Sequence, residues 1–357
     1  MISVIGAGPA GSYAASLLAK DYDVNLYEDH NKIGIPFQCT GILTSAIEDI
    51  IKLPKRLVLN KLSKVKLYSP KGASFEINLK KPDLVIDRIG FDQYIAELAV
   101  KNGAKLHYNH RLIGLQDNKL KFKDKFVETD YIIGADGPMS TVAKSAGLFG
   151  ERRFFLGRQF QARLKEPIPK DTFEVYFGAA PDFFAWAVPE NEELVRIGIA
   201  TVGNVNACFD KFILPRVRGS ICGCQAGLIP VYNPKLKTSK DNIFLIGDAA
   251  TQVKASTAGG IIQGMQAAGY ADQAIRENKD YEKLWRKTLG KELYLHLMIK
   301  KVLYNFKDEE YEKLLSILKD ELGNFNRDNA LKGITALLFR KPSFSLFLAS
   351  KAKYLYR

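Results

Sequence analysis

The sequence predicts a mixed α/β (α+β) chain that ends in a helical region. A strand, a glycine-rich turn and a helix follow one another at the very start. Two long stretches, 56–86 and 151–202, have the composition of β-structure, and apolar residues recur at helical spacing from about residue 276. Sheet-rich segments placed between strand–helix units are typical of a discontinuous α/β domain that carries an inserted antiparallel-sheet domain.

The order of the elements follows from periodicity and turn residues. Strands are expected at 1–6, 24–28, 118–135 and 242–247. The turn residues 69–72 divide the β-structure of 56–86. Helices are expected at 9–20, after Asp87, from Ile261 onward and at 281–306, because apolar residues recur there every three or four positions.

Length and composition limit the class of protein. The 357 residues, of which 46% are hydrophobic and 25% charged, are enough for one large or two packed globular domains. Four cysteines make no disulfide framework, which indicates a reducing compartment. We find no signal-peptide pattern and no apolar run of about 18 residues, so a cytoplasmic protein is expected.

A net charge of +13 calls for an anionic partner. Residues 340–357 combine five lysines or arginines with several large apolar side chains and no acid. That pattern suits a helix on an anionic membrane surface, here the inner face of the cell membrane. The alternative is a basic tail that packs its aromatic residues on its own domain. No nucleic-acid-binding motif is present, so no nucleic-acid partner is expected.

A glycine motif follows the first strand directly and opens the first helix. It consists of Gly6, Ala7, Gly8, Pro9, Ala10 and Gly11. In a Rossmann-like βαβ unit the first glycine permits the tight turn, the second lets the backbone approach a pyrophosphate, and the third lets the helix pack on the strand. Glu28 ends the second strand, where a carboxylate accepts hydrogen bonds from ribose hydroxyls. These residues predict a dinucleotide site.

Two later segments resemble motifs of the p-hydroxybenzoate-hydroxylase-like flavoprotein superfamily. They are Gly134-Ala135-Asp136-Gly137 with Ser140, and Ile246-Gly247-Asp248-Ala249-Ala250. The resemblance implies FAD as the cofactor and a GR2-type FAD-binding domain, with Asp136 near the pyrophosphate and Asp248 on the ribityl chain. It also implies that Arg88 contacts the flavin; the alternative is an ion pair with Asp87 or Asp92. Leu112 is a further expected cofactor contact.

The segment Ala258-Gly259-Gly260-Ile261-Ile262 leads into a helix. Gly259, Gly260 and Ile261 are expected to bring backbone N–H groups and the positive helix end to the pyrimidine edge of the flavin. We find no second glycine motif of the first kind. The flavin is therefore expected to receive electrons from an external donor: NAD(P)H, ferredoxin or another carrier.

Three segments resemble the geranylgeranyl reductase family, most closely its archaeal lipid-saturating branch. Residues 175–189 follow the family pattern PxxYxWxFP, with Phe184 in place of Tyr and Val188 in place of Phe. Residues 247–261 match a second pattern, except that Ala255 replaces Pro and Ala258 replaces Gly. Residues 36–41 resemble a cysteine-containing loop that the family places beside the flavin. The resemblance covers about residues 1–275.

The resemblance implies a reductase that saturates isoprenoid double bonds of geranylgeranyl chains on membrane ether lipids or their precursors. Phe184, Trp186 and Pro189 are then expected to line a pocket for a prenylated lipid, since large rigid apolar side chains suit a hydrocarbon. The alternative is that Phe184 and Trp186 only pack the sheet. Cys39 and Thr40 are expected beside the cofactor. Cys39 is the candidate catalytic residue, or else a small buried hydrophobic side chain.

Other functions are distinguished by experiment. A monooxygenase or halogenase on the same fold is the main alternative, and a flavin-bearing or lipid-binding protein without turnover is the non-enzymatic one.

No metal site is expected, because Cys208, Cys222 and Cys224 lack further ligands at suitable spacing. Residues 227–230 resemble a turn of the family's substrate domain.

Three domains are expected. The FAD-binding domain comprises 1–60, 80–150 and 240–275. The β-sheet substrate domain comprises 61–79 and 151–239, and residues 276–357 form the helical C-terminal region.

Overall fold

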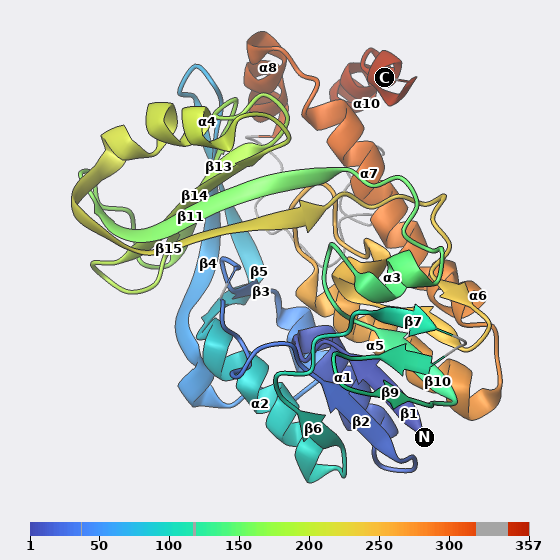
Figure 1. The fold of residues 1–357 in the computed structure, drawn as a ribbon. Helices are drawn as coiled ribbons and strands as arrows, with labels where there is room; N and C mark the ends of the chain where they lie inside the picture. Colours follow the sequence, from blue (N-terminus) through green and yellow to red (C-terminus); the bar gives the residue numbers. More distant parts are fainter. Residues whose placement is uncertain (37, 117–118, 319–341, 357) are drawn as a thin grey trace. The chain divides into compact units, whose positions relative to one another are not determined.

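The computed structural model describes residues 1–36, 38–116, 119–318 and 342–356 (Figure 1). The chain forms two compact units. Unit 1 comprises Met1–Phe37, Arg88–Phe154 and Ile229–Leu297, and unit 2 comprises Gln38–Asp87, Phe155–Leu228 and Met298–Arg357. Segments 38–60 and 80–87 thus group with the large sheet, whereas the expected domains place them in the FAD-binding domain. Residues 276–297 group with unit 1.

Unit 1 is built on a six-stranded sheet with the order β16-β17-β10-β1-β2-β6. All neighbours in it pair in parallel except β16 and β17, which are antiparallel. Its strands are β1 (Ile2–Ile5), β2 (Val24–Tyr27), β6 (Lys105–His107), β10 (Tyr131–Gly134), β16 (Ser239–Lys240) and β17 (Ile243–Leu245). A second, antiparallel sheet contains β7 (Gly114–Gln116), β8 (Lys119–Lys121) and β9 (Phe126–Val127).

The two faces of the parallel sheet are covered differently. Alternate strand residues such as Val4 and Leu26 pack against helices α1 (Pro9–Leu18), α2 (Arg88–Lys101) and α5 (Ile261–Glu277). Their neighbours Ile5 and Tyr27 instead pack with Leu120 of the small sheet and with α3 (Thr141–Ser145). Unit 1 is therefore a three-layer structure of helices, parallel sheet and small antiparallel sheet (Figure 1).

Unit 2 is dominated by an eight-stranded sheet with the order β15-β11-β14-β13-β12-β4-β5-β3. Its strands are β3 (Ile42–Leu43), β4 (Val58–Tyr68), β5 (Ser74–Ile86), β11 (Phe154–Leu164), β12 (Thr172–Phe177), β13 (Phe184–Pro189), β14 (Val195–Thr201) and β15 (Val217–Pro230). Helix α4 (Val205–Phe212) packs on one face, through a core that includes Ala185, Ala187 and Phe209. The other face carries Trp186, which lies opposite Val175 on one side and Gly198 on the other.

Strand β15 corrects one expectation. Residues 227–230, predicted as a turn, are the last residues of this long strand. It forms one edge of the sheet, and most of its side chains are exposed, including Cys222 and Cys224. Its backbone changes hand at two glycines, Gly219 with φ +74° and Gly223 with φ +57°.

The predicted helix at 281–306 is interrupted. Helix α6 (Tyr281–Trp285) and helix α7 (Lys291–Leu303) are separated by a π-helical turn at Arg286–Gly290. Helices α8 (Asp308–Leu318) and α10 (Pro342–Ala349) follow. In the tail, Phe347 packs on Phe306, and Tyr354 donates a hydrogen bond to Glu310. Both tail aromatics are buried, as the second of the two interpretations predicted, whereas Leu346 is exposed.

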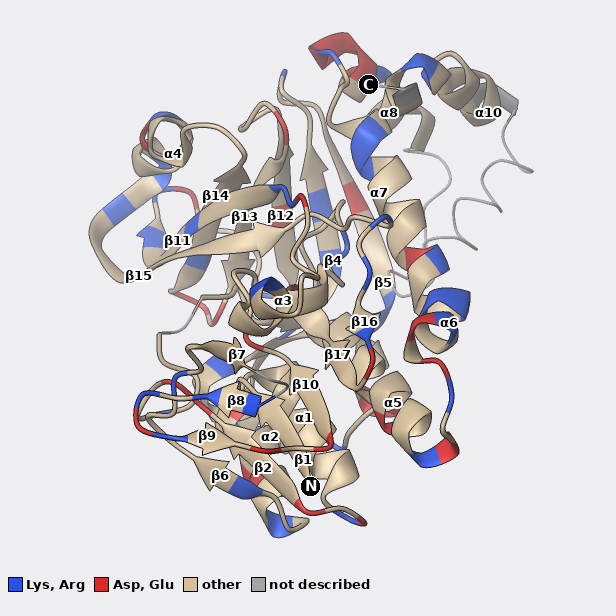
Figure 2. Cartoon of the chain, turned by 45° about the vertical axis from the view of Figure 1, so that its right-hand side comes forward, with Lys and Arg blue, Asp and Glu red and all other residues tan. Residues whose placement is uncertain are grey.

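The charges and the helices bear on membrane association. Figure 2 shows lysines and arginines on elements of both units, for example β6 and α6 in unit 1 and β4 and β5 in unit 2. Within the described part of the chain, no helix combines the length and the apolarity that crossing a bilayer requires. Residues 319–341, and with them the start of the basic tail, lie outside the described residues.

Candidate cofactor site and apolar wall

The predicted glycine turn joins β1 to α1, and two of its glycines have no tolerable substitute. Gly6 has φ +99°, and a Cβ there would lie 2.4 Å from the carbonyl oxygen of Ala135. A Cβ on Gly11 would lie 2.0 Å from the oxygen of Gly6. Gly8 differs, because a Cβ there would meet no atom within 4 Å. The turn is thus tightly packed on the protein side and open at Gly8, at the N-terminus of α1, a position that suits a pyrophosphate.

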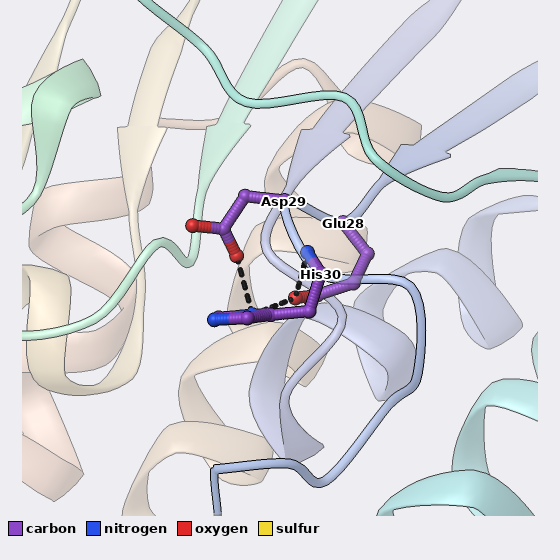
Figure 3. Close-up of side chains that lie close together, drawn as sticks. All are labelled: Glu28, Asp29 and His30. Carbon is purple, nitrogen blue, oxygen red and sulfur yellow. Dashed lines mark hydrogen bonds and ion pairs between the residues drawn. The ribbon is translucent and has the colours of Figure 1, made fainter.

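Glu28 lies directly after β2 and reaches the glycine turn. Its Oε2 accepts a hydrogen bond from the N–H of Ala7 at 2.9 Å, and its Oε1 lies 2.8 Å from His30 Nδ1. Figure 3 shows Glu28 and Asp29 on either side of the His30 ring. Among the described residues, these three are the one group with metal-ligand spacing. We assign no metal to them, because adjacent exposed acidic residues commonly form such groups and Glu28 is bound to the turn.

The second Gly/Asp segment lies beside the glycine turn. A Cβ on Gly247 would be 3.2 Å from the Cβ of Ala10, and a Cβ on Gly264 would be 3.2 Å from the Cα of Gly247. Small residues therefore let α1, the turn at Gly247–Ala250 and α5 approach one another closely. As a result, Asp248, Gly8 and the start of α5 belong to the same end of the unit 1 sheet, as the motif prediction required.

The carboxylate of Asp248 has no hydrogen bond to any described residue. Burial raises its pKa to about 6, and the positive charge of Arg88 opposes that shift. Arg88 itself forms a two-pronged ion pair with Asp92, with distances of 2.7 and 2.9 Å. The ion pair expected as the alternative reading of Arg88 is therefore present, yet the arginine still acts electrostatically on Asp248. A partly buried carboxylate of this kind is suited to bind ligand hydroxyl groups.

The loop before α5 ends at Gly260, the N-cap residue of that helix. Gly259 accepts a hydrogen bond from the N–H of Lys254, and Ala258 adopts φ +58°. The left-handed conformation is unfavourable for alanine, and this is the position where the resembling family has glycine. The first N–H groups of α5, from Ile261 onward, have no partner within the helix.

Two other predicted cofactor residues have interactions within the protein. Asp136 accepts hydrogen bonds from the hydroxyl of Ser140 and from the N–H groups of Thr141 and Val142. It therefore caps the N-terminus of α3. The side chain of Leu112 lies in the core between the parallel and the small sheet. For these two residues the cofactor role stays a prediction.

The arrangement fits a dinucleotide. The open face at Gly8 and the N-terminus of α1 suit a pyrophosphate, and the carboxylate of Glu28 beside them suits a ribose. Asp248 supplies acceptor oxygens on the other side of α1, followed by the N-terminus of α5. These are the features that an FAD molecule requires.

Unit 2 contains the predicted pocket residues Phe184 and Trp186 on one sheet face. Their rings lie 6.1 Å apart, edge to face, and Phe184 stacks on Phe183 at 4.2 Å. Tyr304, at the end of α7, packs against Phe183 at 5.1 Å. We call Phe183, Phe184, Trp186 and Tyr304 the aromatic wall. Pro189 does not join it, because strand alternation places Pro189 on the other face with Ala185 and Ala187.

Cys39 and Thr40 belong to unit 2, where buried polar side chains hold them. The hydroxyl of Thr40 donates to Gln159 Oε1 at 2.7 Å, and the Arg196 guanidinium donates to the Thr40 carbonyl at 2.7 Å. The Cys39 N–H donates to Gln225 Oε1 at 3.2 Å. The N–H of the next residue but one, Gly41, donates to Cys39 Sγ at 3.2 Å and fixes the position of the sulfur.

Several structural residues of these sites were not predicted. Gln252 is fully buried and accepts the N–H of Gly247, which fixes the second Gly/Asp turn. Ser256 Oγ and His296 Nδ1 are hydrogen-bonded at 2.6 Å and tie the loop before α5 to α7. The tyrosine of the wall, Tyr304, comes from the predicted C-terminal helix. Gln252 and Ser256 lie within the matched segment 247–261, but a single sequence carried no signal for His296 and Tyr304.

Comparisons with known proteins agree with this geometry. Residues 4–39 match the family model of the NAD(P)-binding Rossmann-like domain. The chain is 30% identical to the digeranylgeranylglycerophospholipid reductase of Methanosarcina acetivorans over 89% of this chain and 88% of that protein. It is 28% identical to the reductase of the same name from Methanocaldococcus jannaschii, over 96% and 95% of the two chains.

Solved structures show the same fold. A geranylgeranyl bacteriochlorophyll reductase-like protein from Thermoplasma acidophilum superimposes with a TM-score of 0.86 at 24% identity, over 98% of both chains. The halogenase PltM, in complex with phloroglucinol and FAD, superimposes with a TM-score of 0.62 at 13% identity, over 98% of this chain and 86% of that one.

Fold and site together define a dinucleotide-binding protein of the flavoprotein type, in which a Rossmann-like unit is combined with a large sheet that is antiparallel except for the parallel pair β4 and β12. The extent and identity of the match to the archaeal reductases narrow this class further. The chain belongs to the digeranylgeranylglycerophospholipid reductase family.

Proposed function

We propose that this protein is an FAD-dependent reductase acting on CH–CH groups, which saturates the isoprenoid double bonds of geranylgeranyl chains on membrane ether lipids or their precursors. The observation that carries the proposal is the 30% identity to a named reductase across 89% of the chain. The site in unit 1 supplies the matching cofactor chemistry. FAD, when bound, supplies a hydride from the N5 atom of its reduced ring.

The residues of unit 1 bind and orient the cofactor. The N-terminus of α1 binds the pyrophosphate at Gly8, and Glu28 binds the adenosine ribose. Asp248 accepts hydrogen bonds from the ribityl hydroxyls. The N-terminus of α5, after Gly259 and Gly260, places backbone N–H groups and a positive dipole end at the pyrimidine edge, which stabilises negative charge there.

The residues of unit 2 bind the lipid and position the proton source for the second carbon of the double bond. The aromatic wall binds the prenyl chain and excludes water from the double bond. An isolated alkene has no carbonyl to polarise, so a positioned proton source is needed at the second carbon. Cys39 is proposed to act in this step or beside the flavin, with its sulfur held by the N–H of Gly41.

Two partners complete the proposal. An external electron donor, either NAD(P)H, ferredoxin or another carrier, reduces the flavin. The +13 net charge and the basic tail favour work at an anionic membrane surface, on the inner face of the cell membrane, with the body of the protein in the cytoplasm.

A reconstitution experiment tests the function. Purified protein is loaded with FAD, reduced by dithionite without oxygen and mixed with a digeranylgeranylglycerophospholipid. Mass spectrometry is expected to show gains in steps of two hydrogens. If the flavin stays reduced and the lipid mass does not change, the proposal fails. Oxygen consumption with hydroxylated or halogenated product would instead support the monooxygenase or halogenase alternative, for which the structural neighbours provide only the fold.

A further inference from the structure

A chain of buried amides in unit 2 has its direction fixed by Trp186. The indole N–H donates to Gln159 Oε1 at 2.7 Å, and the Thr40 hydroxyl donates to the same oxygen. An indole nitrogen is only a donor, so the Gln159 side chain must present its oxygen to Trp186. Gln159 is 4% exposed, and its Nε2 therefore points away from the wall.

The small size of Gly198 makes this contact possible. Trp186 lies opposite Gly198, and Gly198 lies opposite Gln159 on the next strand. A Cβ on Gly198 would be 2.6 Å from Cζ2 of Trp186. The indole therefore lies across β14 and reaches a residue two strands away.

The chain of amides continues to Gln225. Gln159 Nε2 lies 3.4 Å from Gln225 Oε1 and 3.5 Å from the carbonyl oxygen of Cys39. The N–H of Cys39 donates to the same Gln225 oxygen. Because both neighbours of this oxygen are donors, the Gln225 amide also has one orientation, and its NH₂ group lies at the free end.

In the described part of the chain, the NH₂ group of Gln225 meets no acceptor. Gln225 is only 8% exposed, and its Nε2 is buried without a hydrogen-bond partner among the described residues. It lies on β15, where the neighbouring Cys224 and Ala226 are exposed. Burying an unsatisfied donor is unfavourable, because the donor loses its hydrogen bonds to water. The direction of this donor is fixed by the Gln159 side chain and by the Cys39 backbone N–H, which indicates an acceptor that none of the described residues supplies.

Gln38 covers this region of β15 and can move away from it. A Cβ on Gly227, two residues after Gln225, would lie 2.8 Å from Gln38 Oε1. Gln38 is exposed and has no hydrogen bond to a described residue. Its side chain can therefore move into solvent without losing a hydrogen bond to a described residue, and this movement uncovers the strand at Gly227.

We propose that Gln225 Nε2 is a ligand-binding donor, which binds an oxygen acceptor of the molecule that lies along the aromatic wall. The inference rests on the proposed function and deepens it. The acceptor is the oxygen-bearing end of the prenylated lipid. The lipid then lies with its chain on Phe184 and its polar end toward Gln225.

The test uses the full FAD-loaded chain and the variant Gln225→Glu. A carboxylate keeps the oxygen that accepts from Cys39 and Gln159 but removes the NH₂ donor. Binding of geranylgeraniol and of the corresponding hydrocarbon without oxygen is measured by tryptophan fluorescence, alongside the FAD dissociation constant and the visible flavin spectrum. At pH 8 we expect geranylgeraniol to bind about tenfold more weakly to the variant, and the hydrocarbon to bind equally to both proteins.

The pH dependence separates a donor from a structural role. Lowering the pH protonates the carboxylate introduced at position 225, because burial favours its neutral form. The protonated group carries an O–H donor, so geranylgeraniol binding by the variant is expected to recover. Unchanged binding of geranylgeraniol, whatever the FAD affinity of the variant, or equal loss for both lipids with a lower melting temperature, would overturn the proposal.

A control variant isolates the loop. Gln159→Leu removes the hydrogen bonds that hold Cys39 and Thr40, and is expected to accelerate alkylation of Cys39 in a Cys208→Ser, Cys222→Ser, Cys224→Ser background. Gln225→Glu is expected to leave that rate unchanged, and acceleration there would count against a pure donor role. Lipid binding is measured without turnover. A wild-type protein that reduces no alkene would therefore refute the proposed function, but the comparison of lipid binding between the wild-type protein and Gln225→Glu would still be interpretable.

Discussion

The glycine turn of unit 1 and the aromatic wall of unit 2 depend on close packing in different ways. In the turn, backbone meets backbone: Gly11 has room for no Cβ because the oxygen of Gly6 would lie 2.0 Å away. In the wall, a side chain meets backbone: Gly198 is needed because Trp186 lies across it. The constraint on Gly11 acts within a few residues of sequence, whereas the wall depends on the register of strands that are distant in sequence.

The largest expected effect comes from Gly11→Ala. The new Cβ collides with backbone, which cannot move cheaply, so we expect a loss of about 3 kcal/mol or more of unfolding free energy and a colourless protein. Gly8→Ala is the matched control, because its Cβ meets nothing within 4 Å. It should keep the melting temperature of the apoprotein while weakening FAD binding. Denaturant unfolding and flavin titration check both, and equal melting temperatures for the two variants would contradict the comparison.

Gly198→Ala tests the wall in the same way. Its Cβ would displace the Trp186 ring, and we expect a loss of about 2 kcal/mol of unfolding free energy together with loss of the indole–Gln159 hydrogen bond. A double-mutant cycle with Trp186→Leu measures the coupling. The double variant should be less destabilised than the sum of the single ones. Simple additivity would mean that the ring and the glycine do not constrain each other.

Asp248 gives the pH dependence of cofactor binding. Its pKa of about 6 in the free protein means that the carboxylate is ionised above pH 6. Ribityl hydroxyls donate to the ionised form and lower its pKa, so FAD affinity should rise with pH up to about 6 and then level off. Asp248→Asn should bind FAD roughly tenfold more weakly at pH 8 and show no such rise. A parallel pH profile in the variant would exclude Asp248 as the titrating group.

The smallest effect is expected at Ala258. Glycine adopts φ +58° without strain, so Ala258→Gly should stabilise the protein by about 1 kcal/mol. Ala255→Gly, in the same loop but at a buried alanine without positive φ, serves as the control and should destabilise it. Thermal unfolding of both variants checks the pair. A destabilised Ala258→Gly protein would show that the loop before α5 gains more from the methyl group than it loses in strain.

Much of unit 1 could be predicted from the sequence because its turns depend on backbone geometry. Gly6 and Gly11 stand where a Cβ would collide with backbone, which only glycine avoids. At Asp136 the structure adds a second role, since this residue of the first Gly/Asp motif also caps helix α3, and its cofactor role stays a prediction. Motif and helix cap use the same residue, and the sequence does not separate the two roles.

The wall was less predictable, and for two different reasons. Pro189 could have been excluded from it, since strand alternation separates odd from even positions and thus Pro189 from Phe184 and Trp186. Tyr304 and Gln159 could not have been included, because they reach the wall through long-range packing and strand register. A single sequence carries periodicity, but it does not carry the partner of each strand.

Strand β15 has a consequence for the behaviour of the protein in solution. An extended chain of 14 residues at a sheet edge offers unpaired backbone groups to other molecules, and such edges are templates for aggregation. In β15 the left-handed backbone at Gly219 and Gly223 interrupts that template twice. A concentrated solution of this protein should therefore stay free of edge-to-edge association, and replacing either glycine by a β-branched residue would remove that safeguard.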